Sequence, residues 1–215
     1  MIKCIIFDCD GTLVDSEYLC NLGLEIKLKE YAVTQSAEQL MILYKGMKLA
    51  YVLDCLQEAH QISFKDDFIP TYRAIVENLF EQSLTPCEGV FDLLSRIKLP
   101  VCVASNGPKD KMLKALQLTH LSSFFKNNLY SAYDINSWKP DPGLFLYAAK
   151  KMGFKPEQCL VIEDTLVGIE AAKAGGIRAV LYDPHELHKE TLHKNTSEQL
   201  TIKHMKELEV LLLAD

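Results

Sequence analysis

The chain has 215 residues, which is enough for one α/β domain with an insertion or for two small domains. A formal net charge of -6 argues against a protein that binds the nucleic-acid backbone, because such proteins usually present a basic face. No stretch approaches the roughly 20 apolar residues that span a bilayer, and the N-terminus lacks the apolar region of a signal peptide. We expect a cytoplasmic protein that binds neither nucleic acid nor membrane.

The seven cysteines are odd in number, scattered along the chain, and include no Cys-x-x-Cys pair. This pattern is not that of a disulfide framework. We therefore expect reduced thiols that serve as small apolar side chains.

The start of the chain combines a buried strand with acidic residues. Residues 4–7 form a short apolar run, typical of a strand that is buried on both faces of a parallel sheet. If the strand geometry persists, Asp8 and Asp10 leave its end on the same side, and Gly11 lets the chain turn just beyond them. With Asp15 there are three acids, and like charges about 4 Å apart repel by roughly 4 kcal/mol at an effective dielectric constant of 20. A bound cation would relieve this repulsion.

A long block of helical periodicity follows, and nothing in it resembles a buried strand. Four helices are predicted from apolar positions at helical spacing: Leu19, Leu22, Ile26 and Leu28; Leu40, Leu43 and Tyr44; Leu49, Val52, Leu53 and Leu56; and Phe68 to Phe80. We expect residues 16–84 to form a helical domain that is inserted into a core made of residues 1–15 and 85–215.

From Glu88 onward strands and helices alternate, which predicts a parallel sheet covered by helices. The predicted strands are residues 100–104, 129–131, 158–162 and 178–182, with a short edge strand at 200–202. The predicted helices include one that Asp141 caps and Pro142 begins, and a last one at residues 206–213. The fold class is therefore α/β.

Polar side chains follow four of the predicted strands, and a parallel sheet brings all these strand ends to one edge. They are Asp8 and Asp10, Ser105 and Asn106, Lys139, and Glu163 with Asp164. Carboxylates can hold a metal, a helix N-terminus suits an anion, and a lysine supplies a point charge. Because no His or Cys is among the candidate ligands, hard oxygen donors favour Mg²⁺ over zinc. The set is typical of phosphoryl transfer.

These residues resemble the motifs of the haloacid dehalogenase superfamily of phosphatases and phosphomutases. Residues 8–16 are similar to its first motif, and residues 105–107, 138–142 and 163–165 are similar to the other three, in order. The resemblance covers nearly the whole chain, and the helical insertion is similar to the cap of the β-phosphoglucomutase-like subgroup. Sugar-phosphate phosphatases are the closest in pattern. The resemblance implies a Rossmann-like, three-layer core with a helical-bundle cap.

The resemblance also implies a metal and two catalytic carboxyl groups. Asp8 would be the nucleophile that forms an aspartyl phosphate, and Asp10 would protonate the leaving group and then deprotonate water. Mg²⁺ would be held by Asp8, the backbone carbonyl of Asp10, and Asp164, with Glu163 close by or acting through water. We therefore expect a Mg²⁺-dependent phosphatase.

The remaining roles implied by the resemblance concern the substrate. Ser105 and Asn106 would bind phosphate oxygens, and Lys139 would balance the charge of Asp8 and the transferring group. Lys45 matches a cap lysine that faces the substrate, which makes it a specificity residue. The expected partner is a small phosphorylated metabolite, with a sugar phosphate favoured, and the expected state is a monomer or weak homodimer.

Alternatives remain open from the sequence. A phosphomutase needs a second strong anion site, yet Leu49 stands where that pattern has an arginine. A non-catalytic, phosphate-binding regulatory protein would keep the pocket without turnover. Taken alone, residues 105–108 could be a turn with a helix cap, and Glu163 with Asp164 could be acids at a helix N-terminus.

We expect three histidines and two basic residues to be exposed to solvent. His185, His188 and His193 lack the His-Glu-x-x-His pattern of a zinc site, so we expect a solvated loop. Lys48 and Arg73 are expected on solvated helix faces.

Overall fold

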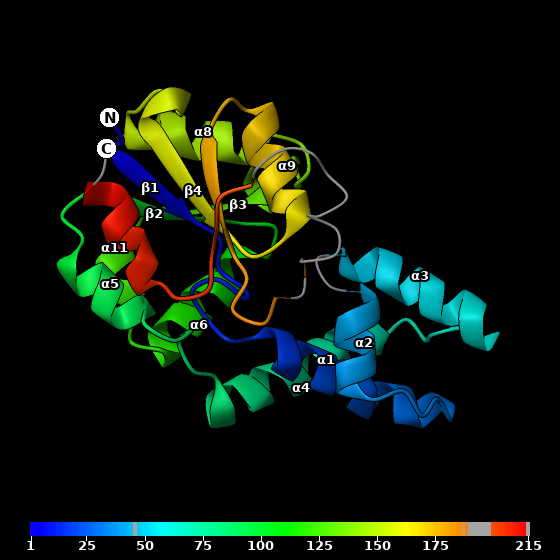
Figure 1. Cartoon of the computed structure of the whole chain (residues 1–215). Helices are drawn as coiled ribbons and strands as arrows, with labels where there is room; N and C mark the ends of the chain where they lie inside the picture. The colour runs from blue at the N-terminus through cyan, green and yellow to red at the C-terminus, as the bar shows by residue number, and fades with distance from the viewer. Residues whose placement is uncertain (45–46, 187, 189–198, 214–215) are drawn as a thin grey trace. The chain divides into compact units, whose positions relative to one another are not determined.

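The computed structural model describes residues 1–44, 47–186, 188 and 199–213. The chain divides into two compact units (Figure 1). The core unit comprises Met1–Val14 and Pro86–Asp215, and the helical unit comprises Asp15–Thr85. Among the described helices, none has the length and apolar character needed to cross a membrane.

The core unit is built on a six-stranded sheet in which neighbouring strands are parallel, in the order β3-β2-β1-β4-β5-β6. The strands are β1 Cys4–Phe7, β2 Val101–Ser105, β3 Leu129–Ser131, β4 Cys159–Glu163, β5 Arg178–Tyr182 and β6 Thr201–Ile202. The predicted parallel sheet is confirmed. All residues of β1 are fully buried in its middle, which explains their continuous apolar run.

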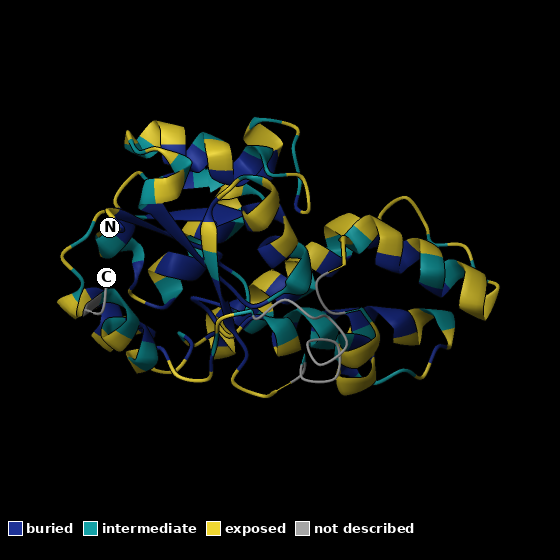
Figure 2. Ribbon diagram, turned by 45° about the horizontal axis from the view of Figure 1, so that its top comes forward, coloured by how far each residue is buried: buried dark blue, intermediate teal, exposed yellow. Residues whose placement is uncertain are grey.

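Helices cover both faces of this sheet. They are α5 Val90–Arg96, α6 Lys109–Leu118, α7 Ser122–Phe125, α8 Gly143–Met152, α9 Leu166–Ala174 and α11 Lys206–Leu213, with the short 3-10 helices η2 Ala132–Asp134 and η3 Pro156–Gln158. α8 and α9 pack on the face that carries Ile6 and Cys102. On the other face, the ring of Phe7 lies 6.1 Å from that of Phe125. The core is thus three-layered and Rossmann-like, with dark-blue strands between helices whose outer sides are yellow in Figure 2.

The pairing register aligns the carboxyl ends of the three central strands. Phe7 pairs with Val103 of β2 and with Ile162 of β4. Just beyond, the N–H group of Asp8 donates to the carbonyl oxygen of Ile162 at 2.9 Å. Because these backbone contacts set the level of each strand, the polar residues that follow the strands meet at one edge of the sheet.

The helical unit, Asp15–Thr85, is built from α-helices. Its α-helices, over the described residues, are α1 Glu17–Leu28, α2 Ala37–Tyr44, α3 Leu49–His60 and α4 Phe68–Ser83, with the 3-10 helix η1 Lys29–Tyr31. α1 packs against both α2 and α4. The predicted apolar face of α3 is buried at Val52, Leu53 and Leu56, and the prediction of helices throughout this block is confirmed.

The predicted apolar stripe of α1 is partly wrong. Leu22 is only half-buried and Ile26 is 37% exposed, whereas Gly23 and Lys27 are buried. A Cβ atom on Gly23 would lie 2.6 Å from Cγ2 of Val76, so α4 approaches α1 closely at the glycine. Hydropathy alone does not mark a glycine as a contact position, and the buried face, which keeps the predicted Leu19 and Leu28, is therefore shifted from the predicted one.

Two smaller expectations also differ from the structure. Leu43 is 53% exposed, because α2 buries the face that carries Leu40. Helix α8 begins at Gly143, one residue later than predicted, with Pro142 as its N-cap. Asp141 nevertheless stabilises the helix start, since its carboxylate accepts the N–H group of Gly143 at 2.8 Å.

Candidate active site

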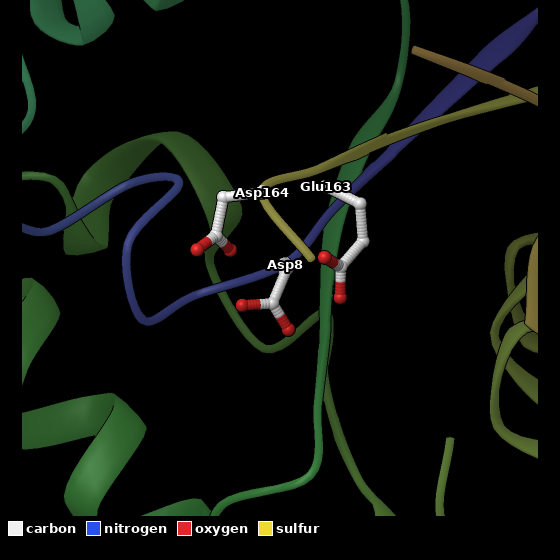
Figure 3. A group of neighbouring side chains, drawn as sticks. All are labelled: Asp8, Glu163 and Asp164. Carbon is white, nitrogen blue, oxygen red and sulfur yellow. The ribbon is translucent and has the colours of Figure 1, made fainter. Parts of the chain in front are cut away.

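Three carboxylates meet at the carboxyl edge of the sheet. Asp8 follows β1, Glu163 ends β4 and Asp164 follows it, and one oxygen of each lies within 4.8 Å of the others (Figure 3). Their exposed fractions are only 6%, 1% and 2%. Buried carboxylates this close repel one another strongly, so the arrangement needs positive charge nearby.

Lys139 supplies part of that charge. Its ammonium group contacts Asp8 Oδ1 and lies 2.8 Å from Glu163 Oε1. Burial alone would lower the pKa of Lys139, but the charges of Asp8 and Glu163 outweigh burial and raise the pKa. Burial raises the pKa of Asp8 to about 7, with Lys139 opposing and Glu163 adding to the rise. One ammonium group cannot balance three carboxylates, so the cluster fits a divalent cation, which would favour the ionised form of Asp8.

Two glycines create the space that the carboxylates occupy. Gly11 has a φ of +77°, and a Cβ atom there would lie 2.4 Å from Asp164 Oδ2. A Cβ atom on Gly168, in the first turn of α9, would lie 2.0 Å from Glu163 Oε1. Any larger residue at either position would displace a carboxylate, so both glycines belong to the architecture of the cluster.

Two threonines hold the same carboxylates in place. The hydroxyl of Thr12 donates to Asp164 Oδ1 at 3.1 Å. The N–H and hydroxyl groups of Thr165 donate to Glu163 Oε2 at 2.6 and 2.8 Å. Lys139 donates to the other oxygen, Oε1, so both carboxylate oxygens of Glu163 accept hydrogen bonds.

Ser105 ends β2, and Asn106 follows it in the loop that leads to α6. Ser105 is buried, and its hydroxyl accepts the N–H group of Gly107 at 3.0 Å. The side-chain oxygen of Asn106 accepts the backbone N–H group of Lys139 at 2.9 Å. This contact orients the NH₂ group of Asn106 as a hydrogen-bond donor for a ligand. An anion needs hydrogen-bond donors of this kind.

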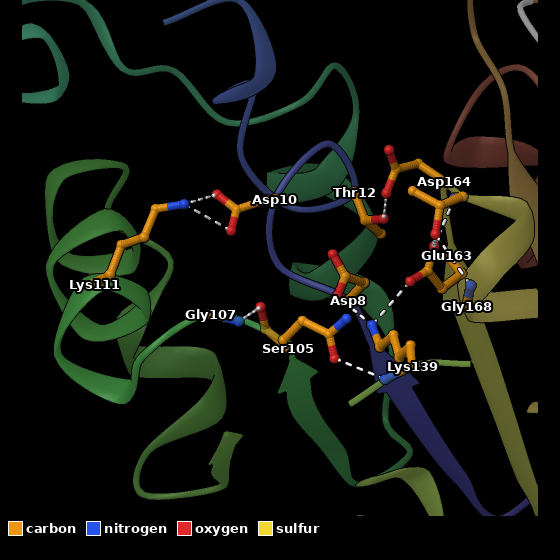
Figure 4. Close-up of polar contacts among 12 residues, drawn as sticks. Asp8, Asp10, Thr12, Ser105, Gly107, Lys111, Lys139, Glu163, Asp164 and Gly168 are labelled. Atoms are coloured by element: carbon orange, nitrogen blue, oxygen red, sulfur yellow. Dashed lines mark hydrogen bonds and ion pairs between the residues drawn. The ribbon is translucent and has the colours of Figure 1, made fainter. Parts of the chain in front are cut away.

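Asp10 lies apart from the three-carboxylate cluster. β1 ends at Phe7, so extended geometry does not continue to Asp10 as the sequence suggested. Instead, both Asp10 oxygens lie 2.9 Å from the ammonium group of Lys111 on α6 (Figure 4). Asp15, the third acid of the first segment, is exposed and not part of the cluster, which Asp8 forms with Glu163 and Asp164.

The sequence interpretation missed Lys111 and misjudged His188. His188 is half-buried rather than solvated, and its Nε2 atom lies 3.0 Å from the backbone oxygen of Asp164. The backbone N–H group of His188 donates to the buried carboxylate of Asp183 at 3.0 Å. The contacts of Lys111 with Asp10 and of His188 with Asp164 have no local sequence signal, since each joins distant segments. The predicted specificity residue Lys45, and also His193, lie outside the described residues.

Comparison of the chain with known proteins identifies its family. The sequence pattern of the haloacid dehalogenase-like hydrolases matches residues 2–176. The chain belongs to this family. Among its relatives is the 6-phosphogluconate phosphatase of Escherichia coli (strain K12), 35% identical over 210 residues, which are 96% of this chain and 93% of that protein. The fructose-1-phosphate phosphatase of the same organism is 30% identical over 179 residues, 82% of this chain and 94% of that protein.

A solved structure supports the same assignment. A haloacid dehalogenase-like protein of Agrobacterium tumefaciens str. C58 superposes with a TM-score of 0.86 at 28% identity, covering 100% of this chain and 99% of that one. The resemblance found in the four motifs is confirmed. The chain is a haloacid dehalogenase-like hydrolase that cleaves phosphoric monoesters.

Proposed function

We propose that the protein is a Mg²⁺-dependent, cytoplasmic phosphatase that hydrolyses a sugar phosphate or a related small metabolite through an aspartyl phosphate on Asp8. The observation that carries the proposal is the buried cluster of Asp8, Glu163 and Asp164, in which Lys139 contacts Asp8 and Glu163, within the residues that the family pattern matches. The names of the two Escherichia coli relatives support a phosphorylated carbohydrate as the substrate class.

The donor set fits Mg²⁺, because the three carboxylates offer only hard oxygen ligands. Asp8 and Asp164 would hold the ion together with the backbone oxygen of Asp10, and Glu163 would act directly or through water. The bound ion would neutralise negative charge on the phosphoryl group.

The reaction then follows in two displacements. A carboxylate oxygen of Asp8 attacks phosphorus, the bond from phosphorus to the sugar oxygen breaks, and Asp10 gives its proton to that oxygen. Water next attacks the aspartyl phosphate, gives a proton to Asp10, and releases phosphate together with the Asp8 carboxylate. Ser105 and Asn106 would hold the phosphate oxygens in both steps, which is where electrostatic positioning matters most.

We favour hydrolysis over phosphoryl transfer between sugars as the reaction. Leu49, the first residue of α3, stands where the phosphomutase pattern has an arginine. A bisphosphate intermediate needs a second strong anion site, and an apolar side chain cannot provide it. Specificity for the sugar is assigned to Lys45, and the protein is expected to be a monomer or weak homodimer; both remain predictions.

The test measures phosphate release from a panel of sugar and sugar-acid phosphates with Mg²⁺. We expect turnover to be abolished by EDTA and to fall by about 10⁴-fold or more in Asp8→Asn, because the nucleophile is lost. Asp15→Asn is the matched control, since it removes the same charge from an exposed acid outside the cluster. Conversion of glucose 1-phosphate to glucose 6-phosphate without release would favour the mutase, and binding without either reaction would favour the regulatory protein.

A further inference from the structure

Lys111 belongs to none of the family motifs, yet its ammonium group lies 2.9 Å from each carboxylate oxygen of Asp10 (Figure 4). An ammonium group within hydrogen-bonding distance of both oxygens fixes the direction in which the Asp10 side chain points. We propose that Lys111 is a positioning residue that aims the Asp10 carboxyl group for proton transfer, a role that rests on the proposed function of Asp8 and Asp10.

The backbone around Asp10 is already held by a tight turn. The N–H group of Val14 donates to the carbonyl oxygen of Cys9 at 3.1 Å, and the N–H group of Gly11 donates to that of Val14 at 2.9 Å. Rotation of the Asp10 side chain is therefore the main remaining freedom. The contact with Lys111 limits that rotation.

The Asp10–Lys111 pair lies beside Gly107, in the loop that follows Ser105. The hydroxyl of Ser131 donates to the carbonyl oxygen of Gly107 at 2.7 Å, and the N–H group of Gly107 donates to Ser105 Oγ at 3.0 Å. A Cβ atom on Gly107 would lie 3.4 Å from Ser105 Oγ, 3.7 Å from Asp10 Oδ2 and 3.9 Å from Lys111 Cδ. The hydroxyl, the carboxylate and the lysine chain thus lie around one glycine, which places Asp10 beside the loop proposed to bind phosphate.

Helix stability does not account for a lysine at this position. Lys111 is the third residue of α6, and the partial positive charge at a helix N-terminus disfavours cations in the first turn. The side chains of Lys111 and Asp10 are 34% and 29% exposed, and ion pairs this exposed contribute little to folding stability. The orientation of Asp10 is what the contact provides.

The first test compares Lys111→Met and Lys111→Arg with Lys109→Met, which removes the same charge from an exposed position in the same turn of α6. With the sugar phosphate that turns over fastest in the panel, we expect Lys111→Met to lower kcat by about 10- to 100-fold, because misaligned proton transfer loses part of its effect. KM should stay within about twofold of the wild-type value. Lys111→Arg should restore part of kcat, and Lys109→Met should match the wild type.

A second measurement distinguishes positioning from structural damage. p-Nitrophenolate leaves without a proton, so formation of the aspartyl phosphate from p-nitrophenyl phosphate does not need Asp10, whereas its hydrolysis does. Lys111→Met should therefore give a burst of about one p-nitrophenolate per site, followed by slow turnover. Asp10→Asn should show the same two phases, and Asp8→Asn should show neither.

Three results would overturn the role of Lys111. The first is an equal kcat for Lys111→Met and Lys109→Met. The second is the loss of both the burst and the steady-state turnover in Lys111→Met. This result would place the damage in the nucleophilic step or in folding. The third is a raised KM with unchanged kcat, which would make Lys111 a substrate-binding residue. A wild-type protein that releases no phosphate from any substrate refutes the proposed function itself, and the proton-transfer role falls with it.

Discussion

Replacing Gly168 by alanine tests the packing that holds Glu163 beside Lys139. Gly168 lies in α9 with an ordinary helical φ, and glycine to alanine in a helix normally stabilises a protein by about 1 kcal/mol. Here the added Cβ atom would lie 2.0 Å from Oε1 and 2.1 Å from Cδ of Glu163. The carboxylate must therefore move, and we expect the sign of the effect to reverse.

The magnitude follows from the contacts that Glu163 would lose. Thr165 gives it two hydrogen bonds, at 2.6 and 2.8 Å, and hydrogen bonds to a charged group contribute about 1.5–3 kcal/mol each. After subtracting about 1 kcal/mol for the gain in helix propensity, Gly168→Ala should lower the free energy of unfolding by about 2–5 kcal/mol. For a chain of this length the melting temperature should fall by on the order of 10 °C.

The assay is urea unfolding in EDTA and in excess Mg²⁺, followed by circular dichroism, with Mg²⁺ affinity measured by calorimetry. Gly175→Ala is the matched control, because it lies at the end of the same helix with a φ of -82° and meets only ordinary contacts, the nearest at 3.4 Å. A Gly168→Ala protein as stable as the wild type, with unchanged Mg²⁺ affinity, would refute the reasoning.

Three further perturbations address the same cluster. Lys139→Met should lower the free energy of unfolding in EDTA by about 3–5 kcal/mol, because it leaves buried carboxylates without their ammonium group; recovery in Mg²⁺ checks the electrostatic cause, and a neutral effect would contradict it. Gly11→Ala should weaken Mg²⁺ binding by at least about tenfold, measured by calorimetry, because its Cβ atom would displace Asp164; wild-type affinity would rule this out. Because burial raises the pKa of Asp8 from 3.8 to about 7, the folded protein binds more protons than the unfolded chain between these values, and stability in EDTA should fall as pH rises through that range. Excess Mg²⁺ should oppose this fall, and a flat pH profile in EDTA would argue against a buried, neutralised Asp8.

Most of the fold could be predicted because its signals are local. The apolar run of β1 and the alternation of strands and helices after Glu88 indicate a parallel sheet, and parallel strands place their carboxyl ends together whatever the details of packing. The carboxylates of Asp8, Glu163 and Asp164 could be placed near one another on this ground alone. Their cluster then follows from topology rather than from long-range packing.

Contacts between distant segments could not be predicted in this way. The exposed Ile26 and the buried Gly23 of α1 depend on how closely α4 approaches, and a glycine has no side chain to mark the contact. His188 reaches the backbone of Asp164 from a loop after β5, and no periodicity links the two segments.

The sequence by itself therefore determined the fold class, the family and the three acids that cluster at the edge of the sheet, since strand ends, turn glycines and motif spacing are properties of short segments. Only the tertiary structure decided the partner of each side chain. It separated Asp10 from the other acids and paired it with Lys111, 101 residues away, and it aimed Lys139 between Asp8 and Glu163. The physical reason is that an ion pair depends on where two side chains meet in space, which the packing of the whole core unit sets.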